Sequence, residues 1–293
     1  MMEKSMLIRI LFVLLAIGQF AAPVEAGWFD SVTGYFKKPA TAKPPKIRVL
    51  IVHDQQGVVV EVKGKYKMYD PHNGEHLSTR FVGKRKFMQA VRDGLKWGEE
   101  FPGLYQLLIV PDETSTTTIV DGIEYRGPIY IYDIGGTISV INEVSIEDFL
   151  ASTLAQRREQ LPEELLAAGV IVARTNAYYA AANPKNQYWS VDARPTNYQG
   201  FAVVDNNSLI QKAVVGTRHM VMSTTPVGDN GQVTAFPAEW KTEASFNGQQ
   251  NVSKITFAQA TEMAKNGEHA AQILMKAFPG VKIELIHYPT EKK

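Results

Sequence analysis

One apolar helix with an arginine near its middle constrains this chain more than any other stretch. Pro162 stands where the helix would begin, and two acids, Glu163 and Glu164, follow it at the positive helix terminus. An Ala-, Leu- and Val-rich run continues to Tyr179, and because it is apolar nearly all round, the helix is predicted to lie in the core. Arg174 interrupts this run, and burying an unpaired guanidinium costs on the order of several kcal/mol. The fold must therefore supply Arg174 with several oxygen partners or a ligand.

A second helix is predicted directly upstream. Ser145 precedes Asp148 by three residues, which is the spacing of a helix start with a reciprocal cap. Residues at helical spacing follow, namely Phe149, Leu150, Thr153 and Leu154. The two helices meet near Gln160-Leu161, so residues 145–183 form a central helix pair.

The two halves of the chain show different periodicities. In the first half, short apolar runs such as 47–52 and 58–62 are typical of buried strands, and Asn73-Gly74 and Asp93-Gly94 are hairpin-turn pairs. The second half is predicted to hold three short helices and a last strand, at 208–217, 256–266, 269–278 and 281–286. The predicted class is α+β, a β-rich N-terminal half followed by a mixed helical and β half that carries the central helix pair.

The N-terminus has the pattern of an export signal. Two basic residues, Lys4 and Arg9, precede an apolar run, and Val24-Glu25-Ala26 has the form of a cleavage site. An uncleaved anchor is the alternative, although the run is shorter than the roughly 20 residues of a spanning helix. Export to the periplasm or cell envelope is therefore expected, with cleavage after Ala26. The expected segments are a signal peptide at 1–26, a Lys/Pro-rich tether at 27–46 and a domain at 47–288, with a β-rich part at 47–142 and a helix-containing part at 143–288.

Composition argues against several classes of function. The formal net charge is +1, which does not suit a nucleic-acid binder driven by bulk charge. The chain has no cysteine and hence no disulfide framework, thiolate chemistry or lipid attachment. His72 and His76 stand four apart, but Asn73-Gly74 breaks any helix between them, so ordinary turn histidines are favoured over a metal site. We expect no metal and no cofactor.

Residues 187–200 are both polar and aromatic, a mixture that carbohydrate sites favour. A flat ring covers the C–H face of a sugar, while amides and carboxylates take its hydroxyl groups. Simple packing of the rings is the commoner alternative. The residues concerned are Tyr188, Trp189, Asp192, Arg194, Asn197, Tyr198 and Gln199.

Several segments in a fixed order carry a family resemblance. Residues 142–150 read NEVSIEDFL, residues 164–168 read ELLAA and residues 172–175 read VART. Together they resemble the central signature of the stage II sporulation protein D family (SpoIID/LytB domain). Tyr198-Gln199-Gly200 resembles the Gln-Val-Tyr-x-Gly element of that family, and residues 264–283 resemble its C-terminal helix and strand. The likeness spans roughly residues 47–286.

The resemblance implies a role in peptidoglycan remodelling. Members are lytic transglycosylases, or partners of cell-wall amidases, that act on glycan strands stripped of their stem peptides. One carboxyl group donates a proton to the glycosidic oxygen and then assists attack by the muramyl 6-hydroxyl. The expected function is a transglycosylase acting at septation with an amidase. The alternatives are a non-catalytic glycan-binding protein that recruits or enhances an amidase, and an exported structural module unrelated to wall glycan. The implied partners are glycan strands and a cell-wall amidase, and no nucleic acid.

The chain departs from the family pattern at the position of the acid. This position falls on Gln156 or Arg157, and neither side chain can donate the proton. Glu159 is the nearest carboxyl group and is the expected catalytic residue, although neighbouring arginines favour its ionised form and a solvated helix end is the alternative. Arg174 matches the signature and is expected to bind a sugar acid or to hold the catalytic carboxylate. The expected substrate contacts are Glu164, Tyr198, Gln199 and Asp192.

Overall fold

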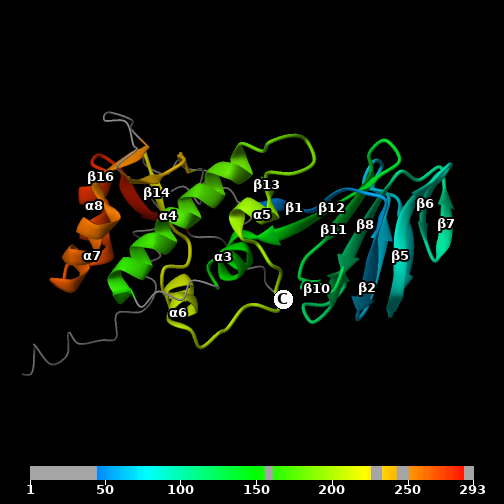
Figure 1. Ribbon diagram of the computed structural model, residues 1–293, viewed down its shortest axis with the longest axis horizontal. Coiled ribbons are helices and arrows are strands. Elements are labelled where there is room, and N and C mark those ends of the chain that lie inside the picture. Colours follow the sequence, from blue (N-terminus) through cyan, green and yellow to red (C-terminus); the bar gives the residue numbers. More distant parts are fainter. Residues whose placement is uncertain (1–44, 156–160, 226–232, 243–250, 287–293) are drawn as a thin grey trace, which may run out of the picture. The chain divides into compact units, whose positions relative to one another are not determined.

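The computed structural model describes residues 45–155, 161–225, 233–242 and 251–286. Strands fill this part of the chain as far as Ser145, and helices with short strands fill the rest (Figure 1). The predicted α+β class is therefore confirmed. The leader, the tether up to Pro44 and the expected acid Glu159 lie outside the described residues.

Two sheets form the β-rich half. Their strands are β1 (Lys46–Gln55), β2 (Gly57–Lys63), β3 (Tyr66–Tyr69), β4 (His76–Arg80), β5 (Gly83–Val91), β6 (Gly94–Trp97), β7 (Glu99–Pro102), β8 (Gln106–Pro111), β9 (Thr117–Val120), β10 (Ile123–Tyr125), β11 (Ile129–Asp133), β12 (Ile138–Ser145) and β13 (Val191–Asp192). One sheet has the order β13-β1-β12-β11-β8-β3-β4, and the other has the order β10-β9-β2-β5-β6-β7. The long strands β1 and β12 pair antiparallel, whereas the short β13 joins the edge parallel to β1.

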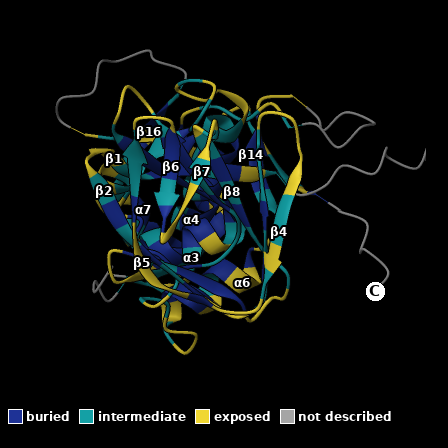
Figure 2. Cartoon of the chain, turned by 90° about the vertical axis from the view of Figure 1, so that its right-hand side faces the viewer, coloured by how far each residue is buried: buried dark blue, intermediate teal, exposed yellow. Residues whose placement is uncertain are grey.

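The two sheets pack face to face over an apolar core. Val58, Val60 and Val62 of β2 are buried and alternate with more exposed residues, as expected for strands with one covered face. The rings of Tyr66 and Trp97, one from each sheet, lie 6.1 Å apart. Figure 2 shows the buried interior between the sheets, while β4 and β7 form exposed or half-exposed edges.

The second half holds helices and short strands. They are α3 (Ile146–Leu154), α4 (Glu163–Ala182), α5 (Ala193–Thr196), α6 (Leu209–Gly216), β14 (Met220–Ser223), β15 (Glu239–Lys241), β16 (Val252–Thr256), α7 (Phe257–Lys265), α8 (Ala270–Ala277) and β17 (Lys282–Leu285). The predicted short helices are confirmed as α6, α7 and α8, with each end one residue inside the predicted range. The predicted last strand is β17, which pairs with β14.

The central helix α4 lies in the core, as its composition predicts. It shares one apolar cluster with β14, α7 and α8, and it also packs on α3 and α6 (Figure 1). Helix α3 follows directly from β12, and the Ser145 side chain accepts a hydrogen bond from Asp148 N at 3.1 Å, which confirms Ser145 as the N-cap. In place of the predicted reciprocal bond to the Ser145 backbone, the Asp148 carboxylate accepts from the Ser145 hydroxyl. Within the described ranges, no helix is both long and apolar enough to cross a membrane.

Candidate functional site

The fold gives Arg174 the oxygen partners that its sequence context requires. The side chain is fully buried. Its Nε and Nη2 donate to the two carboxylate oxygens of Glu147, each at 2.9 Å. Nη2 also donates to Val214 O at 3.1 Å, and Nη1 donates to Thr217 Oγ1 at 3.1 Å and Met220 O at 3.3 Å. All five N–H groups of the guanidinium therefore have protein acceptors. This geometry leaves no donor for a ligand, and of the two expected roles it matches the holding of a carboxylate.

The carboxylate that Arg174 holds is Glu147, which the sequence reasoning did not single out. Glu147 lies in the first turn of α3, and two parallel hydrogen bonds from a guanidinium form the strong bidentate type of ion pair. Its side chain keeps 17% exposure, and His219 Nδ1 lies 3.8 Å from Oε1. The sequence did contain a signal for this pair: an acid shortly after a helix cap, 27 residues before an arginine that needs a partner.

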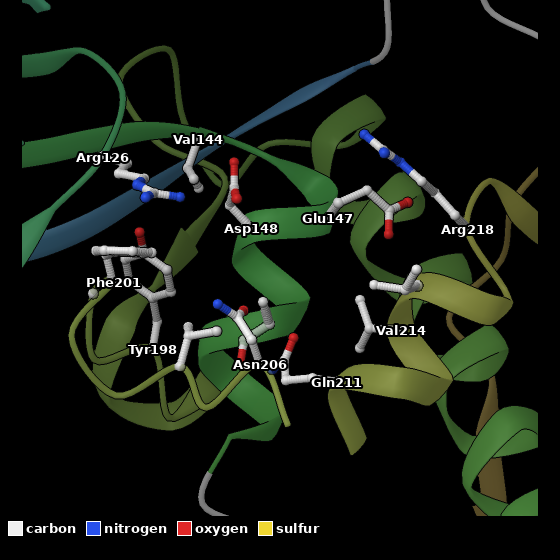
Figure 3. A pocket seen from close by; sticks show the side chains of 14 residues that line it. Arg126, Val144, Glu147, Asp148, Tyr198, Phe201, Asn206, Gln211, Val214 and Arg218 are labelled. Carbon is white, nitrogen blue, oxygen red and sulfur yellow. Dashed lines mark hydrogen bonds between the residues drawn. The ribbon is translucent and has the colours of Figure 1, made fainter. Parts of the chain in front are cut away.

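One edge of Glu147 lines a hollow of about 210 Å³. The hollow lies between the start of α3, helix α6 and the loop that follows Tyr198 (Figure 3). Its lining combines two arginines, two carboxylates, two amides, two aromatic rings and small or aliphatic residues, namely Arg126, Arg218, Glu147, Asp148, Asn206, Gln211, Tyr198, Phe201, Val144, Ala151, Gly200, Val204, Val214 and Val215. Such a mixture of ionic, amide and ring surfaces suits a polar ligand with at least one charge.

Arg126 is the cation of this hollow that has an unpaired buried donor. Its guanidinium carbon lies 3.4 Å from the centroid of the Phe201 ring. Its Nε is buried and has no hydrogen-bond partner. Among the described residues, one other buried side-chain atom, Thr118 Oγ1, has no partner. Buried donors are normally paired. Nε itself is covered, but the Arg126 side chain lines the hollow, so its outer nitrogens can meet an oxygen acceptor brought by a ligand.

Positive charge exceeds negative charge at the hollow. The charge of Glu147 is neutralised by Arg174, which does not line the hollow. The remaining charged side chains of the lining are one carboxylate, Asp148, and two guanidinium groups, Arg126 and Arg218. Asp148 also accepts a hydrogen bond from Ser145 Oγ at 2.7 Å and belongs to the cap of α3. Figure 3 shows Arg126 and Arg218 on different sides of the space, with Glu147 and Asp148 between them. The excess favours an anionic group of a ligand.

Tyr198, an expected substrate contact, lines the hollow through its ring. It is 5% exposed, its hydroxyl donates to Asn142 Oδ1 at 2.5 Å, and its ring stacks on Phe149 with 5.6 Å between centroids. Burial raises the pKa of Tyr198 well above its usual range, so the hydroxyl stays protonated. The Tyr198 hydroxyl is thus used in the hydrogen bond to Asn142 of β12, and the ring forms part of the wall of the hollow.

Glu164, a second expected contact, lies at a different hollow. Its carboxylate accepts hydrogen bonds from Ala270 N at 2.7 Å and from His269 Nδ1 at 3.2 Å, at the start of α8. These bonds lower the pKa of Glu164 below its usual value, and the bond from the Ala270 backbone has the larger effect. Glu164 lines a space of about 320 Å³ with Lys212 and Thr217, and Tyr198 does not line it. A carboxylate held ionised at a helix terminus is poorly suited to donate a proton.

The two remaining expected contacts are not among the residues that line the hollow at Glu147. Asp192 accepts a hydrogen bond from Trp189 Nε1 at 3.0 Å and pairs with Lys185. Gln199 donates from its backbone N to Ser152 Oγ at 3.1 Å. Of the expected residues, the hollow therefore brings together Tyr198 and, through Glu147, Arg174, whereas Glu159 lies outside the described residues. Within the described part of the chain, no three His, Cys, Asp or Glu side chains are grouped as metal ligands.

Comparison with known proteins identifies the family. The sequence model of SpoIID, described as stage II sporulation protein, matches residues 135–223. An uncharacterized protein of Chlamydia pneumoniae is 35% identical over 213 residues, which cover 71% of this chain and 77% of the relative. This chain belongs to the SpoIID family. The matched range of the SpoIID domain begins just before β12 and ends with β14, so it contains Glu147, Arg174 and Tyr198.

Two further relatives place this SpoIID protein among divergent members. An uncharacterized protein of Chlamydia muridarum is 29% identical over 95% of this chain and 91% of its own length. An uncharacterized protein of Brachyspira hyodysenteriae is 29% identical over 60% of this chain and 47% of the relative. No solved structure matches the chain. At the level of the family, membership implies a cell-wall-related role.

The Arg174→Ala variant is expected to lose about 3–5 kcal/mol of the free energy of unfolding, because it leaves Glu147 largely buried without its partner. Urea denaturation followed by circular dichroism measures this loss. Arg218→Ala is the matched control, since this exposed arginine lines the same hollow and its removal should change stability by less than about 0.5 kcal/mol. Equal stability of the two variants would contradict the assigned role of Arg174.

Proposed function

We propose that this SpoIID protein binds peptidoglycan glycan strands that have lost their stem peptides, referred to below as stripped strands. Removing a stem peptide hydrolyses its amide bond to the muramyl lactyl group and leaves a free carboxylate on every second sugar. The hollow at Glu147 takes that carboxylate. The observation that carries this proposal is the pair of arginines, Arg126 and Arg218, on the wall of a space with excess positive charge.

The chemistry of the wall fits this ligand. Carboxylates form short, charge-assisted hydrogen bonds with guanidinium groups, which Arg126 and Arg218 supply. The amides of Asn206 and Gln211 and the face of Phe201 add hydrogen-bonding and flat apolar surface. At about 210 Å³ the space is smaller than the roughly 300–1,000 Å³ of a typical small-molecule pocket. It therefore suits one carboxylate-bearing substituent rather than a length of sugar chain.

The proposed setting is the cell envelope. Export by the leader, with cleavage after Ala26, would bring the protein to peptidoglycan, and the residues from 27 to 46 would act as a tether. A cell-wall amidase creates the stripped strands and is the proposed partner. In this account the protein holds the amidase product and thereby recruits or enhances wall hydrolases at septation.

Lytic transglycosylase activity is the second candidate, and family membership favours it. Cleavage needs a carboxyl group that is protonated near neutral pH. Glu147 is committed to Arg174 and Glu164 to the start of α8. The proton donor in this candidate is therefore Glu159, in the segment that joins α3 to α4. Strand binding is the better supported function because its residues are already assembled around the hollow.

Arg126→Ala and Arg218→Ala are each expected to weaken binding of stripped strands by about 10-fold or more, since a hydrogen bond between charged groups contributes about 1.5–3 kcal/mol. Binding is measured as retention of labelled strands at fixed salt concentration. Lys212→Ala is the matched control, because it removes an exposed cation from α6 that faces a different hollow. If Lys212→Ala weakened strand binding as much as the two arginine variants do, the binding would depend on bulk charge. That result would contradict a specific site at the hollow.

Product analysis separates the two candidate functions. The chain without its leader is incubated with strands before and after amidase treatment, and mass spectrometry detects 1,6-anhydromuramyl ends. We expect stripped strands to be retained without such ends. Anhydro ends that appear with the wild-type chain and disappear with Glu159→Gln, which retains the strands, would instead establish the transglycosylase.

A further inference from the structure

A second groove lies on the outer face of the seven-stranded sheet, away from the residues that line the hollow at Glu147. Four tyrosines line it: Tyr69 of β3, Tyr130 and Tyr132 of β11, and Tyr188 of the segment between α4 and β13. Its volume of about 720 Å³ is within the range of small-molecule sites. The two spaces have no lining residue in common.

Strand register explains why the rings gather on one face. Tyr130 and Tyr132 are two residues apart on β11, so their side chains point to the same side. Tyr130 pairs with Leu108 of β8, and Leu108 pairs in turn with Tyr69 of β3. Tyr188 reaches the same face from its loop, where its backbone N donates to Asn186 Oδ1 at 2.8 Å. The groove is therefore built on three paired strands, β11, β8 and β3, with Tyr188 added from a loop.

The rings pack against one another, and three of them stay partly exposed. Tyr132 is 7% exposed, whereas Tyr69, Tyr130 and Tyr188 are half-buried, and the guanidinium carbon of Arg48 lies 4.6 Å from the centroid of the Tyr130 ring. Tyr130 and Tyr132 lie nearly parallel, with 7° between their planes and 6.2 Å between centroids. The Tyr188 ring is 4.8 Å from Tyr132 and is tilted by 59°. Half-buried rings such as those of Tyr69 and Tyr188 can cover the apolar C–H face of a pyranose ring, whereas the Tyr130 hydroxyl is held by Arg48 and Glu143.

The ionic groups that line the groove are Arg48 and Asp70, one of each sign, together with His72. Arg48 pairs with Glu143 at 3.0 Å, and the Tyr130 hydroxyl lies between them, accepting from Arg48 Nη2 at 3.2 Å and donating to Glu143 Oε2 at 3.3 Å. Burial raises the pKa of Tyr130, and raises the pKa of Tyr132 to about 12, so both phenols stay neutral. Gln106 adds an amide to the lining. Balanced charges, neutral phenols and half-exposed rings suit an uncharged polyhydroxyl ligand better than an ion.

We propose that the tyrosine groove binds the uncharged sugar rings of a glycan strand, the N-acetylglucosamine class. This inference deepens the proposed function and rests on it for the identity of the strand. One site then takes the lactyl carboxylate, and the other takes rings that lack it. Two sites of different chemistry on one chain would let the protein hold a strand at two points, which raises its overall affinity without a new contact at either site.

The test uses a tetrasaccharide of N-acetylglucosamine, which has no lactyl group, titrated by calorimetry into the chain without its leader. Saturable binding is expected, and Tyr188→Ala should weaken it at least 10-fold, whereas Tyr188→Phe keeps the ring and should bind as the wild type does. Tyr69→Ala is the second variant and should weaken binding without altering the loop that carries Tyr188. An unchanged affinity in both alanine variants, or no binding by the wild type, overturns the proposal.

Two further measurements distinguish the tyrosine groove from the hollow at Glu147 and the saccharide from the tether as its occupant. Arg126→Ala should bind the tetrasaccharide normally, so a failure at the hollow and a failure at the groove give different patterns. A synthetic peptide of residues 33–46 tests the Lys/Pro-rich tether as the occupant. Retention of that peptide through Tyr188, together with no binding of the tetrasaccharide, would assign the groove to the tether and overturn the saccharide proposal.

Discussion

The ion pair of Arg174 and Glu147 is the interaction on which the second half of the molecule depends. The buried Arg174 guanidinium donates hydrogen bonds to acceptors in α3, in α6 and the turn after it, and in β14. A buried charge without partners costs on the order of several kcal/mol, so these elements must assemble together around α4. The same pair fixes the first turn of α3, and with it the edge of Glu147 that lines the hollow. The pair therefore both stabilises the second half and positions one side chain of the hollow.

The sequence predicted elements whose ends carry local signals. Helices α6 and α7 begin after the capping residues Ser208 and Thr256, and both were placed to within one residue. Strand β5 escaped prediction because its first half is charged and exposed and its buried Met88 comes late. The need of Arg174 for oxygen partners was also predictable. The identity of these partners was not, because they lie 27 to 46 residues away in sequence and meet through tertiary packing.

The aromatic stretch at 187–200 shows why a site is harder to predict than a helix. Composition marked it as one candidate for carbohydrate binding, yet the fold divides it. Tyr198 turns into the core against Phe149, whereas Tyr188 packs against Tyr132 on the outer face of the sheet. Neither the sheet order nor its register can be read from the loop alone. Arg126 was missed for a similar reason, because its unpaired donor appears only when Phe201 is packed against it.

The central claim is that the hollow recognises a free lactyl carboxylate, and chemical modification of the ligand tests it most directly. Stripped strands and the same strands with their lactyl carboxylates converted to amides are compared for affinity to the unmodified protein at one salt concentration. The conversion keeps the size of the group and removes its charge, so the account predicts that amidated strands bind at least about 10-fold more weakly. Equal affinity for the two ligands would contradict it.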